Sequence, residues 1–161
     1  MAVDIFAKIG DIKGEALDAK HKDEVEVLSY SWGVTNPGSM GYGGGGGEGK
    51  ATFHDLSFVH NVDKASPVLM QACVLGTHFK EATITHRKSG TGKEPHEYMI
   101  VKMNDVIITG VTHGGGGGGP HSENVSISFS KVAVVYKPQK ADGTLDAAVV
   151  FKYDLKQSKE G

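Results

Sequence analysis

Residues 124–137 read NVSISFSKVAVVYK, a stretch in which apolar side chains alternate and then change phase. Val125 and Ile127 occupy alternate positions, whereas Val132 and Val134 alternate on the opposite parity. Alternate residues of a strand share one face, so a change of parity moves the apolar side chains to the other face. A strand that exchanges its buried face must bend. Long, bent strands are typical of barrels and closed sandwiches, in which the sheet curls on itself.

Strand patterns cover most of the remaining sequence. Residues 25–34 repeat the change of phase, because Val25 and Val27 share one parity while Leu28 and Tyr30 share the other. Two adjacent apolar residues at such a switch predict a bulge or a bend. Further strands are expected at residues 3–9, 51–60, 79–88, 97–103, 106–112 and 149–155.

One segment has helical periodicity. Ser66 as N-cap, Pro67 at the first helical position and Gly76 just past the end delimit a short helix over residues 66–75. The face predicted to be buried comprises Leu69, Met70, Cys73 and Val74. We therefore expect a single, mainly β domain over residues 1–161. Its predicted architecture is a closed or curled antiparallel β-barrel of two sheets, with this helix packed at its side.

Composition and charge exclude several classes of function. The 161 residues carry a formal net charge of −2 and a single arginine, Arg87, which argues against a nucleic-acid groove. The lone cysteine, Cys73, indicates a reducing compartment and is expected to be a core residue. The N-terminal residues lack the pattern of a signal peptide, and no stretch approaches the ~20 apolar residues of a membrane span. We expect a protein made in the cytoplasm, without membrane insertion.

The glycine-rich run at residues 41–49 has the spacing of a nucleotide-binding loop. From Gly44 the sequence GGGGEGKA follows the pattern G-x-x-x-x-G-K-[S/T]. However, Ala51 stands where a hydroxyl must hold Mg²⁺, and residues 51–60 predict a strand where the phosphate site needs a helix. The sequence therefore predicts a loop between strands and no nucleotide site.

Histidines are the second candidate for chemistry. His54 and His60 share one face of a predicted strand, but their spacing separates them by about 20 Å. His113 and His121 flank a run of six glycines and converge only if that loop folds back, with Glu123 close by in sequence. Solvated histidines are the simpler interpretation. The sequence predicts no catalytic residue, no metal site and no cofactor.

Several long stretches together resemble one known family. They are MAVDIFAKIGDIKGE, KHKDEVEVLSYSWGV, DLSFVHNVDKASPVLMQACVLGTHFKEATI, ENVSISFSKVAVVYKPQKADG and the glycine-rich loop after Trp32 and Gly33. In this order they cover nearly the whole chain. They resemble the hemolysin-coregulated protein (Hcp) family, the tube subunits of bacterial type VI secretion.

The resemblance implies a β-barrel with one helix at its side and no enzymatic activity. Members of the family assemble as hexameric rings that stack into a hollow tube. A contractile sheath drives the tube, tipped by a spike protein, out of the cell with effector proteins in its lumen. The implied partners are further copies of this chain, the sheath and spike proteins, and effectors. The implied route out of the cell is type VI secretion, without a signal peptide.

Two sets of residues become candidate sites under this resemblance. In residues 28–32 the large side chains take one face, so Ser29 and Ser31 on the other face are expected to line the lumen and contact cargo. The second set is an assembly loop that reaches a neighbouring subunit, because glycine permits close approach between backbones. Its residues are Gly41, Gly43, Gly44, Gly45, Gly46, Gly47, Glu48 and Lys50.

Two other classes of function stay open on the sequence alone. A closed sheet of this size also suits a monomeric protein that binds a small ligand. An enzyme is the third class, either a nucleotide hydrolase that uses Lys50 or a histidine–metal hydrolase. The oligomeric size of the purified protein separates the ring subunit from both.

Overall fold

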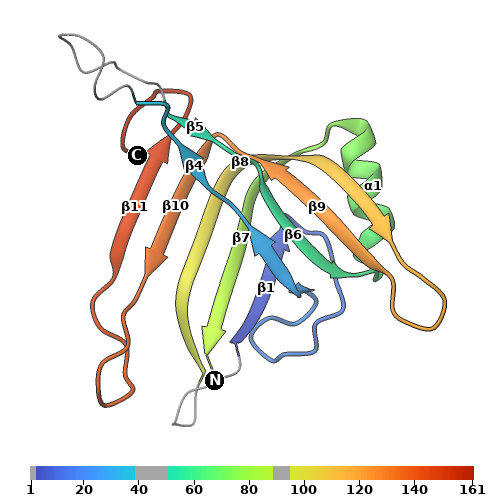
Figure 1. Cartoon of the computed structure of the whole chain (residues 1–161), viewed down its shortest axis with the longest axis horizontal. Coiled ribbons are helices and arrows are strands. Elements are labelled where there is room, and N and C mark those ends of the chain that lie inside the picture. The colour runs from blue at the N-terminus through green and yellow to red at the C-terminus, as the bar shows by residue number, and fades with distance from the viewer. Residues whose placement is uncertain (1–2, 39–50, 89–94) are drawn as a thin grey trace.

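The computed structural model describes residues 3–38, 51–88 and 95–161. They form a β structure with one helix at its side (Figure 1). The helix is α1 (Ala65–Leu75). The strands are β1 (Val3–Ile9), β2 (Val25–Val27), β3 (Ser29–Ser31), β4 (Val34–Thr35), β5 (Thr52–Phe53), β6 (Leu56–Asn61), β7 (His78–Lys88), β8 (His96–Gly114), β9 (Ser122–Ser128), β10 (Lys131–Tyr136) and β11 (Val149–Asp154). All strand pairs are antiparallel, which confirms the prediction of a mainly β protein with one short helix.

The 19-residue strand β8 organises the main sheet. One of its edges pairs with β7, and the other pairs first with β10, from Met99 to Asn104, and then with β9, from Ile107 to Gly114. The change of partner falls at Asp105, whose φ of 52° is rare for a residue with a side chain. The strand order is β2-β1-β7-β8-β9-β6-β3, with β10 and β11 attached to β8, while β4 and β5 form a separate two-stranded sheet.

Two strand predictions around this point are wrong. The expected strands at residues 97–103 and 106–112 are one continuous strand, β8, and the expected strand at residues 124–137 is two, β9 and β10. The change of phase within residues 124–137 was interpreted as a bend. Phe129 and Ser130 instead end one strand and begin the next, so that the two strands occupy successive parts of the same β8 edge. Side-chain parity does not distinguish these two arrangements.

The predicted change of buried face within residues 25–34 is confirmed, but the single strand expected there is divided into β2, β3 and β4. Val25 and Val27 of β2 are buried, and Tyr30 of β3 packs against the core from the opposite parity. Leu28 lies between the two strands and is 59% exposed, so its expected place on the buried face with Tyr30 is wrong. The chain changes sheet partner at Leu28, which leaves that side chain on neither buried face.

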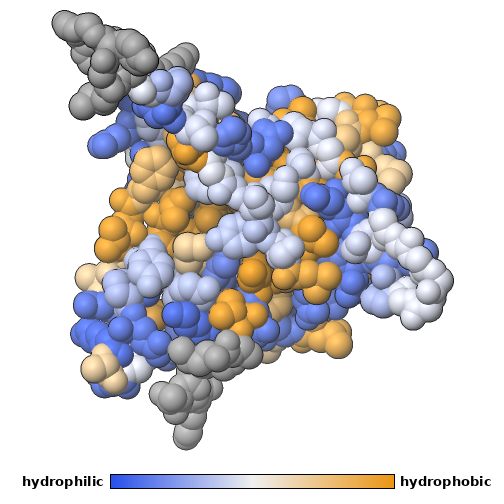
Figure 2. All heavy atoms as spheres, in the orientation of Figure 1, coloured by the Kyte–Doolittle hydropathy of each residue, from blue (hydrophilic) through white to orange (hydrophobic). Residues whose placement is uncertain are grey.

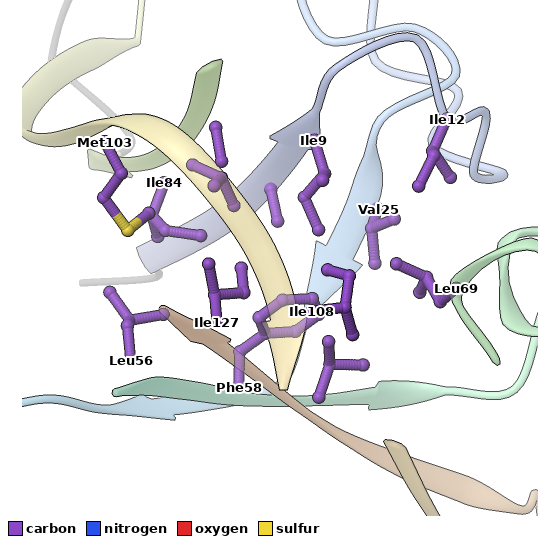
Figure 3. Packing of buried hydrophobic residues seen from close by; sticks show 14 of the residues in the cluster. Ile9, Ile12, Val25, Leu56, Phe58, Leu69, Ile84, Met103, Ile108 and Ile127 are labelled. Carbon is purple, nitrogen blue, oxygen red and sulfur yellow. The ribbon is translucent and has the colours of Figure 1, made fainter. Parts of the chain in front are cut away.

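One continuous hydrophobic core lies between the strands and the helix. Phe58 of β6, Ile127 of β9 and Ile84 of β7 are fully buried and point into this core, as do Met103 and Leu69 (Figure 3). Burial of each such side chain contributes roughly 1.5–3 kcal/mol to folding. The core therefore comes from residues far apart in the sequence, and α1 packs against β8 through the same cluster.

The helix forms where predicted, but it turns a different face inward. Its N-cap is Lys64 rather than Ser66, and Gly76 ends it with the left-handed φ of 62°. Ala65, Ser66, Leu69 and Ala72 are its buried residues. The expected burial of Met70 and Val74 is wrong, because these side chains are 41% and 79% exposed. The helix carries apolar residues on several of its faces, so periodicity alone did not identify the buried face.

The connection of residues 10–24 is held to the sheet by the one arginine. Arg87 Nη2 donates to Asp18 Oδ2 at 2.6 Å and to Asp4 Oδ2 at 3.3 Å, and its guanidinium lies 4.9 Å from the centre of the Phe6 ring. The guanidinium holds the pKa of Asp18 well below its ordinary value of 3.8. The loop is thereby fixed by a charge-assisted contact rather than by apolar packing alone.

His21 adds a second attachment for the same connection. Its ring stacks on Phe6 with centroids 4.5 Å apart, and its two nitrogens lie 2.8 Å from carboxylate oxygens of Glu24 and Glu97. Both contacts are hydrogen bonds when both ring nitrogens carry protons. Since Glu97 belongs to β8, His21 connects this loop directly to the central strand.

We predict that Asp18→Asn destabilises the protein in a pH-dependent way. The lowered pKa of Asp18 in the folded state means that its stabilisation is present above about pH 4 and is lost as the pH falls further. At pH 7 the substitution should cost about 1 kcal/mol after allowance for solvent screening. Urea unfolding of both proteins between pH 7 and pH 2.5 should show that the difference in their free energies of unfolding decreases as the pH falls. An equal difference at pH 7 and pH 2.5 would contradict the stabilising role of the Asp18 carboxylate.

Candidate functional site

Small side chains form one surface across four neighbouring strands. Ser31 of β3 lies opposite Ser57 of β6, which lies opposite Ser126 of β9, and Ser126 lies opposite Gly110 of β8. Residues directly opposite in an antiparallel pair share a face of the sheet. Ser57 Oγ and Ser126 Oγ are 3.0 Å apart and share a hydrogen bond. One row of the surface therefore consists entirely of serine and glycine.

A second row runs beside the first on the same side of the sheet. Its members in order are Ser29, Val59, Asn124 and Thr112. Ser29, Asn124 and Thr112 are exposed, and Val59 is half-buried. We call the two rows together the serine face: Ser29, Ser31, Ser57, Val59, Gly110, Thr112, Asn124 and Ser126. Its side chains are short, so they protrude little from the sheet. Its hydroxyl and amide groups can both donate and accept hydrogen bonds.

Core packing on the other side of the sheet explains why the serine face points outward. Phe58 lies between Ser57 and Val59, and Val125 lies between Asn124 and Ser126; both hydrophobic residues are completely buried. Because side chains alternate along a strand, burial of these residues forces their small neighbours outward. The expectation that Ser29 and Ser31 are exposed is confirmed. Their partners on β6, β8 and β9 were missed, although the alternating pattern of residues 124–128 carried the necessary signal.

A row of ionisable residues lies beneath one end of this surface, on the core side. His60 of β6 is opposite Glu123 of β9, which is opposite His113 of β8. Glu123 and His60 are completely buried, and His60 Nε2 lies 2.8 Å from Glu123 Oε1. His113 Nε2 pairs with Glu123 Oε2, and His60 Nδ1 lies 3.8 Å from Asp63 Oδ2. The carboxylate thus joins three strands through two imidazole rings.

These contacts account for two of the histidines considered as metal ligands. Nothing in residues 3–38, 51–88 and 95–161 groups three or more His, Cys, Asp or Glu side chains so that they could hold a metal ion. His113 pairs with Glu123, while His121 lies against Gly115 in the following loop. His54 Nε2 lies 3.2 Å from Thr35 Oγ1 at the surface, whereas His60 is buried in the core. His60 and His113 therefore connect β6, β8 and β9 through Glu123.

The predicted assembly loop, Gly41 to Lys50, lies outside the described residues. Within the described ranges, no helix has both the length and the hydrophobicity needed to cross a membrane.

Comparison with known proteins identifies the class of this β structure. The family described as "Type VI secretion system effector, Hcp" matches residues 6–136. The chain is 46% identical to Protein hcp1 of Pseudomonas aeruginosa over 160 residues, which is 98% of both chains. It superposes on Hcp1 from Salmonella typhimurium with a TM-score of 0.79, at 34% identity and complete coverage of both chains. A further solved structure, of a type six secretion system protein, gives a TM-score of 0.92 at 27% identity, with 99% and 100% coverage.

The chain belongs to the Hcp family. Its function is that of a structural subunit of the type VI secretion tube and not that of an enzyme. Proteins of this family are secreted by the same system. The serine face is therefore considered as a surface for contact with other macromolecules rather than as a site of catalysis.

Proposed function

We propose that this protein assembles head to tail into hexameric rings, and that the rings stack into a hollow tube that carries effector proteins in its lumen. The sheath and spike proteins of the secretion system are the other proposed partners. One observation carries the proposal: the family match extends over nearly the whole chain and not over a short motif. On this proposal the chain acts as a single domain, made in the cytoplasm and released through type VI secretion.

Exposed apolar side chains at both ends of the subunit support assembly. Tyr136, Val149 and Phe151 are 41–65% exposed on β10 and β11, where hydrophobic residues gather on the surface (Figure 2). Val74 and Leu75 are 79% and 68% exposed on α1, which lies at the other end of the long axis (Figure 1). Large exposed apolar patches mark contact surfaces. Two different patches at opposite ends suit a head-to-tail contact that closes by rotation.

We also propose that the main sheet closes on itself as a barrel. The support is that the first and last strands of the sheet order, β2 and β3, are consecutive in the sequence. β2 pairs with β1, β3 pairs with β6, and Leu28 alone separates β2 from β3. The Leu28 N–H donates to the Val59 carbonyl oxygen at 2.7 Å, which continues the β6 pairing up to this residue. Closure removes free strand edges.

Sizing of the purified protein tests the assembly. We expect light scattering coupled to gel filtration to report roughly six subunits at high protein concentration and low salt. Electron micrographs of the same sample should show rings. A strictly monomeric protein under these conditions would contradict the proposal and favour the alternative, a monomeric small-ligand-binding barrel.

We propose that the serine face lines the lumen and contacts cargo. The chemistry of the face supports this role, because many short hydroxyl and amide groups bind a protein surface weakly at many points. Weak, distributed contacts hold an effector during assembly and allow its release after secretion. Ser31 lies in the row of smallest side chains, so a larger residue there is expected to protrude.

Replacement of Ser31 by glutamine should therefore reduce the amount of effector that co-purifies, about tenfold or more if two hydrogen bonds are lost. The ring should remain intact, since Ser31 is exposed. Thr77→Gln is the matched control, because Thr77 is exposed beyond the end of α1 and outside the serine face. Quantitative mass spectrometry of co-purified protein measures the effect. Equal effector levels in the two variants would show that the serine face does not contact cargo.

We propose that residues 41–50 form an assembly loop between subunits. Glycine-rich backbone approaches another chain closely, and the free energy spent on ordering it offsets part of the contact energy. Contacts between stacked rings would then be weak enough for the tube to assemble and later disassemble. Glu48 and Lys50 would add a charged contact worth less than about 1 kcal/mol.

Deletion of Gly43 to Gly47 tests this loop. The shortened protein should keep its circular dichroism spectrum and its rings, but tube stacking and secretion should decrease together. The control replaces the same five glycines by a Gly-Ser linker of equal length. Normal tubes and normal secretion of the deletion variant would identify the segment as a connection without a role in assembly.

A further inference from the structure

A surface of negative charge lies between the first connection, β2 and β6. It is a depression of about 230 Å³, which we call the acidic groove. Its lining includes three carboxylate residues, Glu15, Glu26 and Asp63, and the apolar residues Ala16, Leu28 and Val62. Leu28 and Val62 are 59% and 41% exposed, so the groove has an uncovered apolar centre.

The negative charge of the acidic groove is poorly compensated within the subunit. Among the described residues, the Glu26 side chain makes no hydrogen bond and no ion pair. Glu15 Oε2 accepts the backbone N–H of Lys64 at 2.9 Å, its one hydrogen bond within the described parts of the chain. Burial raises the pKa of Asp63, the Ala65 N–H and the His60 ring lower it, and the charges of Glu15 and Glu123 raise it. His60 Nδ1, which lies 3.8 Å from Asp63 Oδ2, faces this carboxylate from the core side. The groove thus holds more carboxylates than cationic partners.

A surface of positive charge lies on β8, β10 and β11. It is a second depression, of about 370 Å³, which we call the basic face. Lys102, Lys131 and Lys152 line it together with Ala133, Val135 and Tyr153. Lys102 of β8 is opposite Ala133 of β10, which is opposite Lys152 of β11, so both lysines flank one small apolar residue on the same face.

Two of these lysines have no ion-pair partner among the described residues. Lys131 Nζ lies 3.7 Å from Asp154 Oδ2. Neither Lys102 nor Lys152 forms an ion pair with any residue in the described parts of the chain. The basic face therefore presents two uncompensated ammonium groups around apolar surface, which is the reverse in sign of the acidic groove.

The two surfaces lie on opposite ends of one run of strands. Along the order β2-β1-β7-β8-β10-β11, the acidic groove borders the first strand and the basic face includes the last. In Figure 1, β10 and β11 lie at one end of the molecule and α1, which follows Asp63, lies at the other. One subunit therefore does not bring its own two surfaces together.

We propose that the basic face of one copy docks against the acidic groove of the next copy. This inference rests on the ring assembly proposed above and names the surfaces that join its subunits. Each surface has an apolar centre and a charged rim, the usual anatomy of a protein interface. Opposite charges orient the encounter and disfavour contacts between identical surfaces. Because the two surfaces differ, the contact is heterologous and every copy uses both.

Charge reversal at each surface, followed by mixing, tests the proposal. Lys102→Glu/Lys152→Glu makes both surfaces of one variant acidic, and Glu15→Lys/Glu26→Lys makes both surfaces of the other basic. Each variant alone should need at least about tenfold more protein than the wild type to assemble. An equimolar mixture should restore assembly, because every contact then joins surfaces of opposite charge. Such a ring alternates the two variants and closes only with an even number of subunits.

The control is Lys8→Glu/Lys80→Glu, which makes the same change of net charge as Lys102→Glu/Lys152→Glu, but at exposed residues outside both surfaces. It should assemble like the wild type. Circular dichroism establishes that each variant is folded. If a reversal prevents folding, the neutral variants Lys102→Gln/Lys152→Gln and Glu15→Gln/Glu26→Gln replace it, and each should weaken assembly in the same direction.

The outcomes separate this inference from the proposed function. Normal assembly of both folded reversal variants would overturn the docking surfaces and leave the ring proposal standing. Loss of assembly that the mixture does not restore would also overturn them, since the lost contact would not be complementary. A wild-type protein that stays monomeric would contradict the ring itself and this interface with it.

Discussion

The change of partner along strand β8 is the constraint on which the rest of the fold depends. At Asp105 the strand adopts a left-handed φ of 52°, and β10 gives way to β9 on the same edge. Ser130, between β9 and β10, stabilises this junction: its N–H donates to the Asn104 carbonyl oxygen at 3.0 Å, and its hydroxyl donates to Asp105 Oδ2 at 2.8 Å. These two contacts hold the chain at the point where β9 ends and β10 begins. One half of β8 thereby supports the serine face, and the other half supports the edge formed by β10 and β11.

The two halves of β8 support surfaces of different character. The half of β8 that carries β9 and β6 has a tightly packed inner side, in which Phe58 and Val125 are fully buried, and a low polar outer side. The half that carries β10 and β11 keeps apolar and basic side chains exposed, among them Phe151 and Lys152. The surface proposed for contact with cargo and the surface proposed for association between copies thus belong to one strand. Each can vary without rearranging the core of the other.

Buried ionisable groups act as connectors between the sheet and its attachments. Arg87 holds the first connection through Asp18, and Glu123 joins β6 to β8 through His60 and His113. Such groups are expensive to bury unless they are paired, so their pairing also fixes which elements lie together. Two of the eight histidines, His60 and His113, thereby serve to join neighbouring strands.

The sequence by itself determined the mainly β class, the helix ended by Gly76, the outward direction of Ser29 and Ser31, and, through resemblance, the family. These properties are local or depend on alternation, which requires only the parity of side chains along a strand. Only the tertiary structure decided which strands are neighbours, that residues 124–137 divide between two strands, and which face of α1 is buried. It also decided that Lys102 and Lys152 flank one residue, and that Glu123 lies between two histidines. Strand register joins residues distant in sequence, and no local pattern records which distant residue lies opposite.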